Sequence, residues 1–121
     1  MPAPTDYLER TRGRILAPDE HVRVVSRVDI VRSLPASTGH ARGRVVLALT
    51  DSRLLLVTSS IRATRAQVIA QWPAGRLCIK AAKRKLGNNL IHIQTGEGQD
   101  LWFEWISGHR PQEWANLRFR Q

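Results

Sequence analysis

Two runs of apolar, β-forming residues separated only by Asp51 and Ser52 constrain the fold most. Residues 43–50 read GRVVLALT and residues 53–58 read RLLLVT. Strands joined by so short a turn pair side by side in opposite directions, so the segment predicts an antiparallel hairpin. Both runs are apolar on successive rather than alternate residues, and a strand with two apolar faces needs cover on both. We therefore expect packing on each face, and an N-terminal helix can supply one of the two layers.

A further strand is expected just before the hairpin, over residues 21–32. Val24 and Val28 share one parity, whereas Arg27 and Asp29 share the other. Alternation with a period of two predicts a strand that buries one face and leaves the other in water. The charged residues of the second parity are therefore expected to be solvated.

The remaining segments predict a helix, seven strands and a second helix, in that order. The first helix spans residues 4–16, and a closing helix begins at Pro111 and carries Trp114. Strands without intervening helices give an antiparallel sheet, which closes most naturally into a small barrel or an orthogonal sandwich. The last four strands are predicted at residues 67–72, 76–82, 89–95 and 101–106.

Basic residues exceed acidic ones, and the excess is concentrated in the middle of the chain. Lys and Arg number 19 against 10 Asp and Glu, a formal net charge of +9 that favours anionic partners. Near the N-terminus, acids between residues 6 and 20 can offset the local arginines. No Asp or Glu occurs between Asp51 and Glu97. Eight cations in this interval therefore lack a partner within it: Arg53, Arg62, Arg65, Arg76, Lys80, Lys83, Arg84 and Lys85.

Four short segments occur in an order typical of one known family. Leu16–Glu20 forms an acidic turn, residues 50–54 carry a Thr-Asp-x-Arg-Leu pattern, Leu90–Ile93 precedes a turn at Gly96, and Trp114 lies in the closing helix. Over roughly residues 15–119 the chain thereby resembles a bacterial pleckstrin-homology-like (PH/GRAM-like) domain. The resemblance implies a mainly β fold, a seven-stranded bent barrel capped by a C-terminal helix, here preceded by a short N-terminal helix. It implies a binding scaffold without catalysis, and such a scaffold does not fix the ligand.

The resemblance also implies one candidate phosphate site. Phosphoinositide-binding PH domains often carry a basic residue at the end of the first strand and a basic-x-basic triplet at the start of the second. Arg32 and the triplet containing Arg42 and Arg44 match this layout. Converging guanidinium groups chelate phosphate well, although a chain so rich in arginine also produces such spacings by chance.

A second candidate depends on pairing between the strands at 76–82 and 89–95. Their outward residues and the turn between them then form one basic surface that suits a nucleic-acid backbone or an acidic membrane. The plainer interpretation is a solvated face that keeps the protein soluble. The residues of this surface are Arg76, Lys80, Lys83, Arg84, Lys85 and His92, with Arg62 and Arg65 in the preceding polar connection.

Trp102 is the candidate protein-interface residue. Trp102 and Trp105 have opposite parity on one predicted strand, so at most one of them points into a regular barrel. We expect burial for Trp105 and Trp114. An exposed tryptophan is typical of a protein interface, which leaves Trp102 as the residue of interest.

No signature of catalysis or of a bound cofactor is apparent. Phosphate-loop, dinucleotide-binding and nucleophile-elbow patterns are missing, and the four histidines are scattered. The single cysteine, Cys78, excludes an internal disulfide and a multi-thiolate zinc site, and is expected to be a buried or inert thiol. We therefore expect a protein that is not an enzyme and uses no cofactor or metal.

The combined expectation is a non-enzymatic binding module that docks an acidic protein or an anionic membrane surface through a basic face. The alternatives are nucleic-acid binding through the same surface, and a scaffold that associates with itself as a homo-oligomer. No apolar run approaches the ~20 residues that cross a membrane, so a cytoplasmic location is expected, with peripheral membrane attachment as an option. Residues 1–18 are assigned to an N-terminal helical extension, and residues 19–121 to the barrel with its C-terminal helix.

Overall fold

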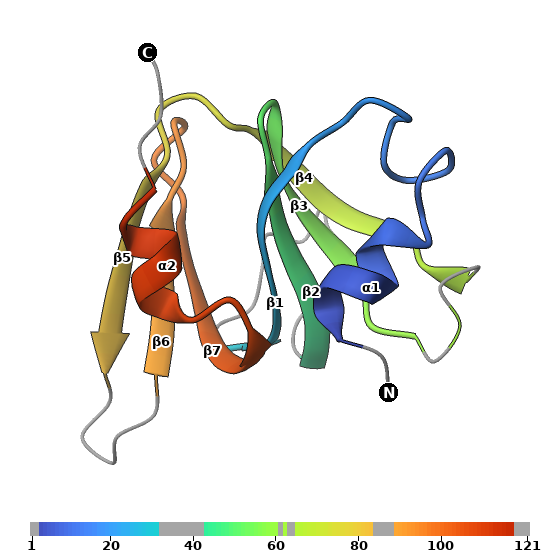
Figure 1. The fold of residues 1–121 in the computed structure, drawn as a ribbon. Coiled ribbons are helices and arrows are strands. Elements are labelled where there is room, and N and C mark those ends of the chain that lie inside the picture. Colours follow the sequence, from blue (N-terminus) through green and yellow to red (C-terminus); the bar gives the residue numbers. More distant parts are fainter. Residues whose placement is uncertain (1–2, 32–42, 61, 63–64, 84–88, 118–121) are drawn as a thin grey trace.

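The computed structural model describes residues 3–31, 43–60, 62, 65–83 and 89–117. They form a short helix, seven strands and a second short helix, which is the predicted order (Figure 1). The elements are α1 (Pro4–Glu9), β1 (Val22–Ile30), β2 (Gly43–Thr50), β3 (Arg53–Thr58), β4 (Val68–Pro73), β5 (Cys78–Lys83), β6 (Asn89–Gln94), β7 (Asp100–Gly108) and α2 (Pro111–Ala115).

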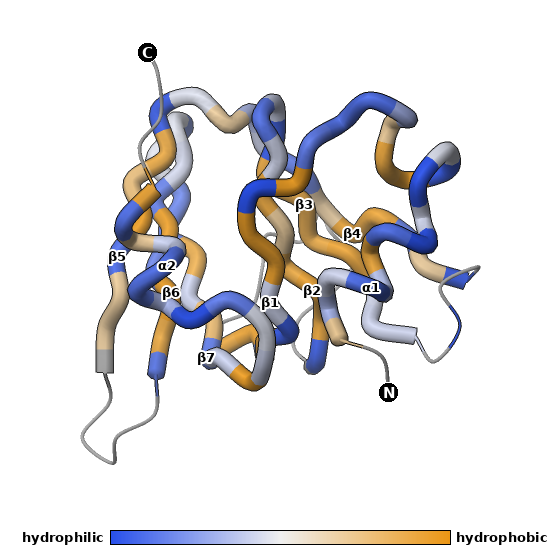
Figure 2. The backbone as a smooth tube through the Cα atoms, in the orientation of Figure 1, coloured by the Kyte–Doolittle hydropathy of each residue, from blue (hydrophilic) through white to orange (hydrophobic). Residues whose placement is uncertain are grey.

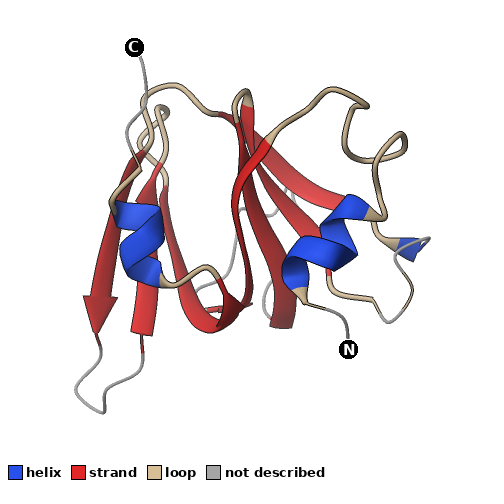
Figure 3. Cartoon of the chain, viewed as in Figure 1, coloured by secondary structure: helices blue, strands red, loops and turns tan. Residues whose placement is uncertain are grey.

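All seven strands belong to one antiparallel sheet that is bent but not closed (Figure 3). The strand order is β4-β3-β2-β1-β7-β6-β5, so β4 and β5 are the two edges. The mainly β prediction is confirmed. Closure into a barrel is not observed, because no ladder joins β4 to β5 among the described residues. β4 is distorted by a register shift and ends at Pro73, whose nitrogen has no hydrogen to donate to another strand.

The β2–β3 hairpin forms as predicted, with Asp51 and Ser52 as its turn. Its register pairs Leu49 with Leu54 and Leu47 with Leu56. Successive residues along each strand face opposite sides of the sheet. Both sides of this hairpin are buried, which confirms the prediction of cover on each face.

One face of the sheet packs against α2 and holds the larger apolar core. Leu47, Ile91 and Phe103 are fully buried there together with Trp114 from α2. The Trp114 indole Nε1 donates to Ser26 Oγ at 2.8 Å, and Ser26 Oγ donates to the carbonyl of His109. The predicted closing helix, with its tryptophan inside, is therefore confirmed.

The opposite face of β1, β2 and β3 packs against α1 and holds a second core. Tyr7 and Leu8 of α1 are fully buried against strand residues such as Val46 and Leu55. The Tyr7 hydroxyl donates to the Thr58 carbonyl at 2.8 Å. Figure 2 shows the apolar stretches along these strands, with α1 and α2 beside different parts of the sheet.

The first helix is shorter than the sequence predicts, ending at Glu9 rather than at residue 16. Gly13 has a φ of +89°, a left-handed conformation that a continuing helix does not accept. The chain instead turns back, and the Arg12 guanidinium donates to the carbonyls of Ala17, Pro18 and Glu20. These bonds hold the acidic turn in place.

The prediction that β1 leaves one face in water is wrong. Val25 and Arg27 share the supposedly wet parity, yet Val25 is fully buried and Arg27 is only 7% exposed. The cause is the cover on this face, where α1 packs on Val25 and Ser59 Oγ accepts from Arg27 Nε at 3.3 Å. Asp29, farther along the same face, is half-buried.

Candidate anion-binding surface

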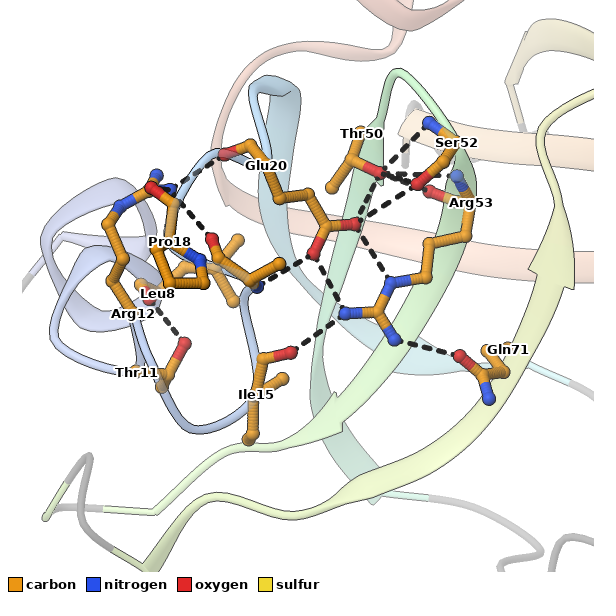
Figure 4. A network of polar contacts seen from close by, with 11 residues as sticks. Leu8, Thr11, Arg12, Ile15, Pro18, Glu20, Thr50, Ser52, Arg53 and Gln71 are labelled. Atoms are coloured by element: carbon orange, nitrogen blue, oxygen red, sulfur yellow. Dashed lines mark hydrogen bonds and ion pairs between the residues drawn. The ribbon is translucent and has the colours of Figure 1, made fainter.

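The most extensively bonded polar group joins the acidic turn to the β2–β3 hairpin (Figure 4). Arg53 donates from Nε and Nη2 to the two carboxylate oxygens of Glu20, each at 2.8 Å. Thr50 Oγ1 also donates to Glu20 at 2.8 Å. The remaining Arg53 donors reach Gln71 Oε1 at 2.8 Å and the Ile15 carbonyl at 2.7 Å. We call these contacts the Glu20–Arg53 network.

This network explains why the acidic turn at Leu16–Glu20 and the Thr-Asp-x-Arg-Leu pattern at residues 50–54 occur together. The Glu20 side chain is only 7% exposed, and desolvation alone would raise its pKa. The hydrogen bonds from Arg53 outweigh that effect, and Thr50 and the Ala17 amide assist, so the pKa of Glu20 falls to about 2. The same bonds raise the pKa of Arg53. Arg53 therefore belongs to the fold: its partner comes from outside the acid-free interval in which the sequence placed it.

Other contacts between basic side chains and carboxylates join described residues. Arg12 contacts Glu9 at 2.8 Å, and its hydrogen bond lowers the pKa of Glu9. Arg23 lies 3.9 Å from Asp51, and His92 Nε2 lies 2.8 Å from Asp100. Offset of arginine by acid near the N-terminus is thus confirmed for Arg12.

The predicted cations that the structure describes fall into separate places. Arg44 is the second residue of β2, Arg62 and Arg65 lie in the β3–β4 connection, Arg76 lies in the β4–β5 turn, and Lys80 lies on β5. All five side chains are exposed. Lys83 is described only as the last residue of β5, and its side chain is not. The positions outside the described residues are Arg32, Arg42, Arg84 and Lys85.

Arg44, Arg62 and Arg65 lie at one end of the sheet, which we call the arginine-rich end. The β2–β3 register pairs Val45 with Thr58, so Arg44 lies where β3 leaves the sheet toward Arg62. The Arg65 amide bonds to the Arg62 carbonyl at 3.0 Å, so these two arginines share one turn. Among the described residues, no carboxylate lies within 4.0 Å of these three guanidinium groups.

Two further arginines approach the same end from neighbouring elements. Arg14 donates from Nη1 to the Ala66 carbonyl at 3.1 Å, which holds its charge against the β3–β4 connection. Arg27 reaches Ser59 at the end of β3. Exposed charges interact over about 8 Å at physiological ionic strength, whereas Arg27 is only 7% exposed and so adds little to the charge that this end presents to solvent. Guanidinium groups in this setting can bind phosphate or carboxylate groups in a bidentate manner.

The strand pairing behind the second basic surface is present, but the surface is mixed in charge. β5 pairs with β6, and Lys80 lies opposite His92 on the side of these strands away from the α2 core. His92 is held by Asp100, so an acid lies within this face. Arg76 lies at the far end of β5 beside Gly96, where a Cβ built on that glycine would approach Arg76 Cβ to 3.2 Å.

Trp102 forms a contact that the sequence analysis missed. Its ring stacks on the His92 imidazole with centroids 4.0 Å apart and planes inclined by 8°. The two residues are direct cross-strand neighbours on β6 and β7. The predicted hairpin around Gly96 could have revealed that His92 and Trp102 are neighbours, because the length of a turn sets which residues lie opposite each other. Trp102 is half-buried, so its role in a protein interface stays a prediction.

Trp114, Trp105 and Cys78 differ in how well their burial matches the prediction. Trp114 is fully buried, as predicted, whereas Trp105 is half-buried. The Trp105 indole Nε1 is itself buried and has no hydrogen-bond partner among the residues that the structure describes. Cys78 is exposed on the edge strand β5, so of the two expected states, buried or inert, only an inert thiol stays a prediction.

Within the described ranges, no three side chains of His, Cys, Asp or Glu gather so that they could hold a metal ion. Neither described helix is long and apolar enough to cross a bilayer.

Comparison with known proteins adds no relative. No family model matches the chain, and no curated protein matches its sequence. The resemblance to PH-like domains therefore stays a prediction that is based on the motifs quoted above and on a strand order compatible with it.

Proposed function

We propose that the protein is a non-enzymatic binding module that docks an anionic surface, either an acidic protein or an anionic membrane, through its arginine-rich end. The observation that carries the proposal is the state of Arg44, Arg62 and Arg65. These side chains are exposed at one end of the sheet, and no described carboxylate lies within ion-pair distance of them.

The distribution of the acids supports the same proposal. Glu9, Glu20 and Asp51 already contact arginines of the chain, and Asp100 contacts His92. With a formal net charge of +9, the cations left over must attract anions from outside. Because a guanidinium group is weakly hydrated and forked, contact with carboxylate or phosphate costs it little desolvation.

Nucleic-acid binding, the alternative use of the same charge, has weaker support. A single-strand binder needs aromatic rings on which bases stack. Trp102 already has the His92 ring on one face, and Trp72, which lines a cavity with Arg76, is buried and bonded through its indole Nε1 to Gln99. Self-association as a scaffold depends on the sheet edges, β4 and β5, at which another copy could add a strand.

The test compares two double charge reversals of equal net charge. Arg44→Glu with Arg62→Glu alters the arginine-rich end, whereas Arg10→Glu with Arg76→Glu reverses two exposed arginines elsewhere. Binding is measured by pelleting with phosphatidylcholine vesicles containing phosphatidylserine, and by fluorescence anisotropy with a labelled polyglutamate peptide and a DNA duplex. We expect the first variant to lose about tenfold or more in affinity for vesicles or polyglutamate and the second to lose far less.

The three ligands separate the possible partners. Retention on vesicles alone indicates a membrane partner, and retention on polyglutamate alone indicates an acidic protein. Preference for duplex DNA, with a steep dependence of affinity on salt, would reject the proposal in favour of the nucleic-acid alternative. Equal losses in both variants would also reject it, because they would mean that net charge acts without a site.

A further inference from the structure

A cavity of about 230 Å³ lies where the turn between β4 and β5 meets the turn between β6 and β7. Figure 1 shows the β4–β5 connection passing close to the tip of the β6–β7 hairpin. Drug-sized ligands occupy cavities of about 300–1,000 Å³, so this one suits a smaller molecule. The residues that line it from the end of β4 and the turn after it are Trp72, Pro73, Gly75 and Arg76, and those that line it from the turn after β6 are Thr95, Gly96 and Glu97.

Contacts between the two turns hold the walls of this cavity in place. The Trp72 indole Nε1 donates to Gln99 Oε1 at 2.8 Å, which joins the end of β4 to the β6–β7 turn. Arg76 has a φ of +63°, in the left-handed region that residues other than glycine seldom adopt. A Cβ built on Gly96 would lie 3.2 Å from Arg76 Cβ and 3.7 Å from Arg76 Cδ. The missing side chain at Gly96 therefore leaves room for the stem of Arg76 at the rim of the cavity.

Thr95 brings an unused hydrogen-bond donor to the cavity. The residue is only 5% exposed, and its Oγ1 accepts from the Gln99 amide at 3.2 Å. A hydroxyl group also carries one hydrogen that it can donate. Among the described residues, none accepts a hydrogen bond from Thr95 Oγ1. The buried hydroxyl is therefore free to donate to an acceptor atom of a ligand in the cavity.

Two opposite charges at the rim determine which ligand fits. Arg76 and Glu97 are exposed and line the same cavity, yet neither forms an ion pair with another described residue. Glu97 repels a ligand that is only anionic, and Arg76 repels one that is only cationic. A molecule that carries both a carboxylate and an ammonium group gains from both residues. Trp72 and Pro73 add an apolar wall, against which an apolar side chain can pack.

We propose that this cavity binds a free α-amino acid with an apolar side chain. The carboxylate of the amino acid pairs with Arg76 and accepts from the Thr95 hydroxyl. Its ammonium group pairs with Glu97, and its side chain lies against Trp72 and Pro73. This ligand has no net charge and the cavity shares no residue with the arginine-rich end, so either proposal can fail while the other holds.

The probes are L-leucine and L-valine, titrated into the full chain labelled with nitrogen-15. Of the four tryptophan indole N–H signals, we expect that of Trp72, identified by its loss in Trp72→Phe, to shift most. The backbone amides of Arg76 and Glu97 should shift with it. Two analogues of leucine each lack one charged group: 4-methylpentanoate has no ammonium, and 3-methylbutylamine has no carboxylate. Each analogue should bind about tenfold or more weakly than leucine, because it loses a charged hydrogen bond.

Two variants match each charge of the protein with one group of the ligand. Arg76→Gln should weaken binding of leucine about tenfold or more, but should not weaken binding of 3-methylbutylamine, which has no carboxylate. Glu97→Gln should weaken binding of leucine by a similar factor, but should not weaken binding of 4-methylpentanoate. Arg62→Gln, at an exposed arginine of the arginine-rich end, is the control and should bind leucine as the wild type does. All three positions are exposed, and circular dichroism of each variant establishes that it is folded.

The results that would overturn the proposal are distinct. An unmoved Trp72 indole signal at millimolar leucine and valine would show that the cavity does not take an amino acid. Binding of 4-methylpentanoate as tight as that of leucine would indicate a plain anion site, and equally tight binding of 3-methylbutylamine a plain cation site. A loss in Arg62→Gln as large as that in Arg76→Gln would mean that net charge acts without the cavity.

Discussion

The Glu20–Arg53 network makes a measurable prediction about stability and pH. The pKa of Glu20 is lowered from 4.5 to about 2 in the folded chain, because Arg53 and Thr50 bind its ionised form. A group whose pKa is depressed by folding stabilises the fold above its unfolded pKa and loses that effect as pH falls toward its folded pKa. Stability from Glu20 is therefore complete at pH 7 and declines from about pH 5 to about pH 2.

The size of the effect follows from the two pKa values. Lowering the pKa of Glu20 from 4.5 to about 2 corresponds to about 3 kcal/mol of unfolding free energy at pH 7. About 2 kcal/mol of this stabilisation is lost by pH 3. Because the Glu20 side chain is only 7% exposed, solvent screening reduces this value little. The Glu20→Gln variant keeps the shape of the side chain but has no proton to gain in this range.

The assay is urea unfolding of the wild type and of Glu20→Gln at a series of pH values from 7 to 3. The difference in unfolding free energy between the two proteins should shrink by about 2 kcal/mol over that range. Glu97→Gln, the same substitution at an exposed turn position, is the control and should leave the pH dependence of the wild type nearly intact. If wild type and Glu20→Gln lost stability in parallel, the assigned role of Glu20 would be wrong.

Two further predictions concern positions where the backbone or a buried polar group is tightly constrained. Gly108 and Gly98 both have positive φ, but a Cβ at Gly108 would lie 2.6 Å from the Val25 carbonyl, whereas a Cβ at Gly98 meets nothing within 4 Å. Gly98→Ala should therefore cost about 1 kcal/mol and Gly108→Ala at least about 1 kcal/mol more in urea unfolding, and equal costs would contradict the geometry. Ser26→Ala leaves the Trp114 indole N–H and the His109 carbonyl without a bond, and should cost about 1–3 kcal/mol. A loss of less than about 0.5 kcal/mol would show that another group replaces the hydroxyl.

Much of the fold could be predicted because its signals are local. The turn at Asp51 and the two-sided apolar runs around it predicted both the hairpin and its double cover. The prediction for β1 failed because alternation reports chemical type, not what another segment places above a face. Val25 is covered by α1, and Arg27 is bonded to Ser59 just after β3, segments that lie far from β1 in the sequence.

The candidate site was harder to predict, for a similar reason. Counting acids within the interval 51–97 left Arg53 without a partner, yet Glu20 reaches it from 33 positions earlier. The stack of His92 on Trp102 depends on a cross-strand register that parity alone does not give. The sequence thus shows which charged residues are present, but only the folded chain shows which of them already contact a partner.

The β2–β3 hairpin belongs to two cores at once, and this limits how the protein can evolve. A strand with one wet side can change every other residue freely, but here a replacement at Leu47 disturbs the core under α2 and one at Ala48 disturbs the core under α1. Among descendants of this chain, the hairpin should thus accumulate the fewest changes, while the side of β5–β7 that no helix covers remains free to diversify and acquire new specificities.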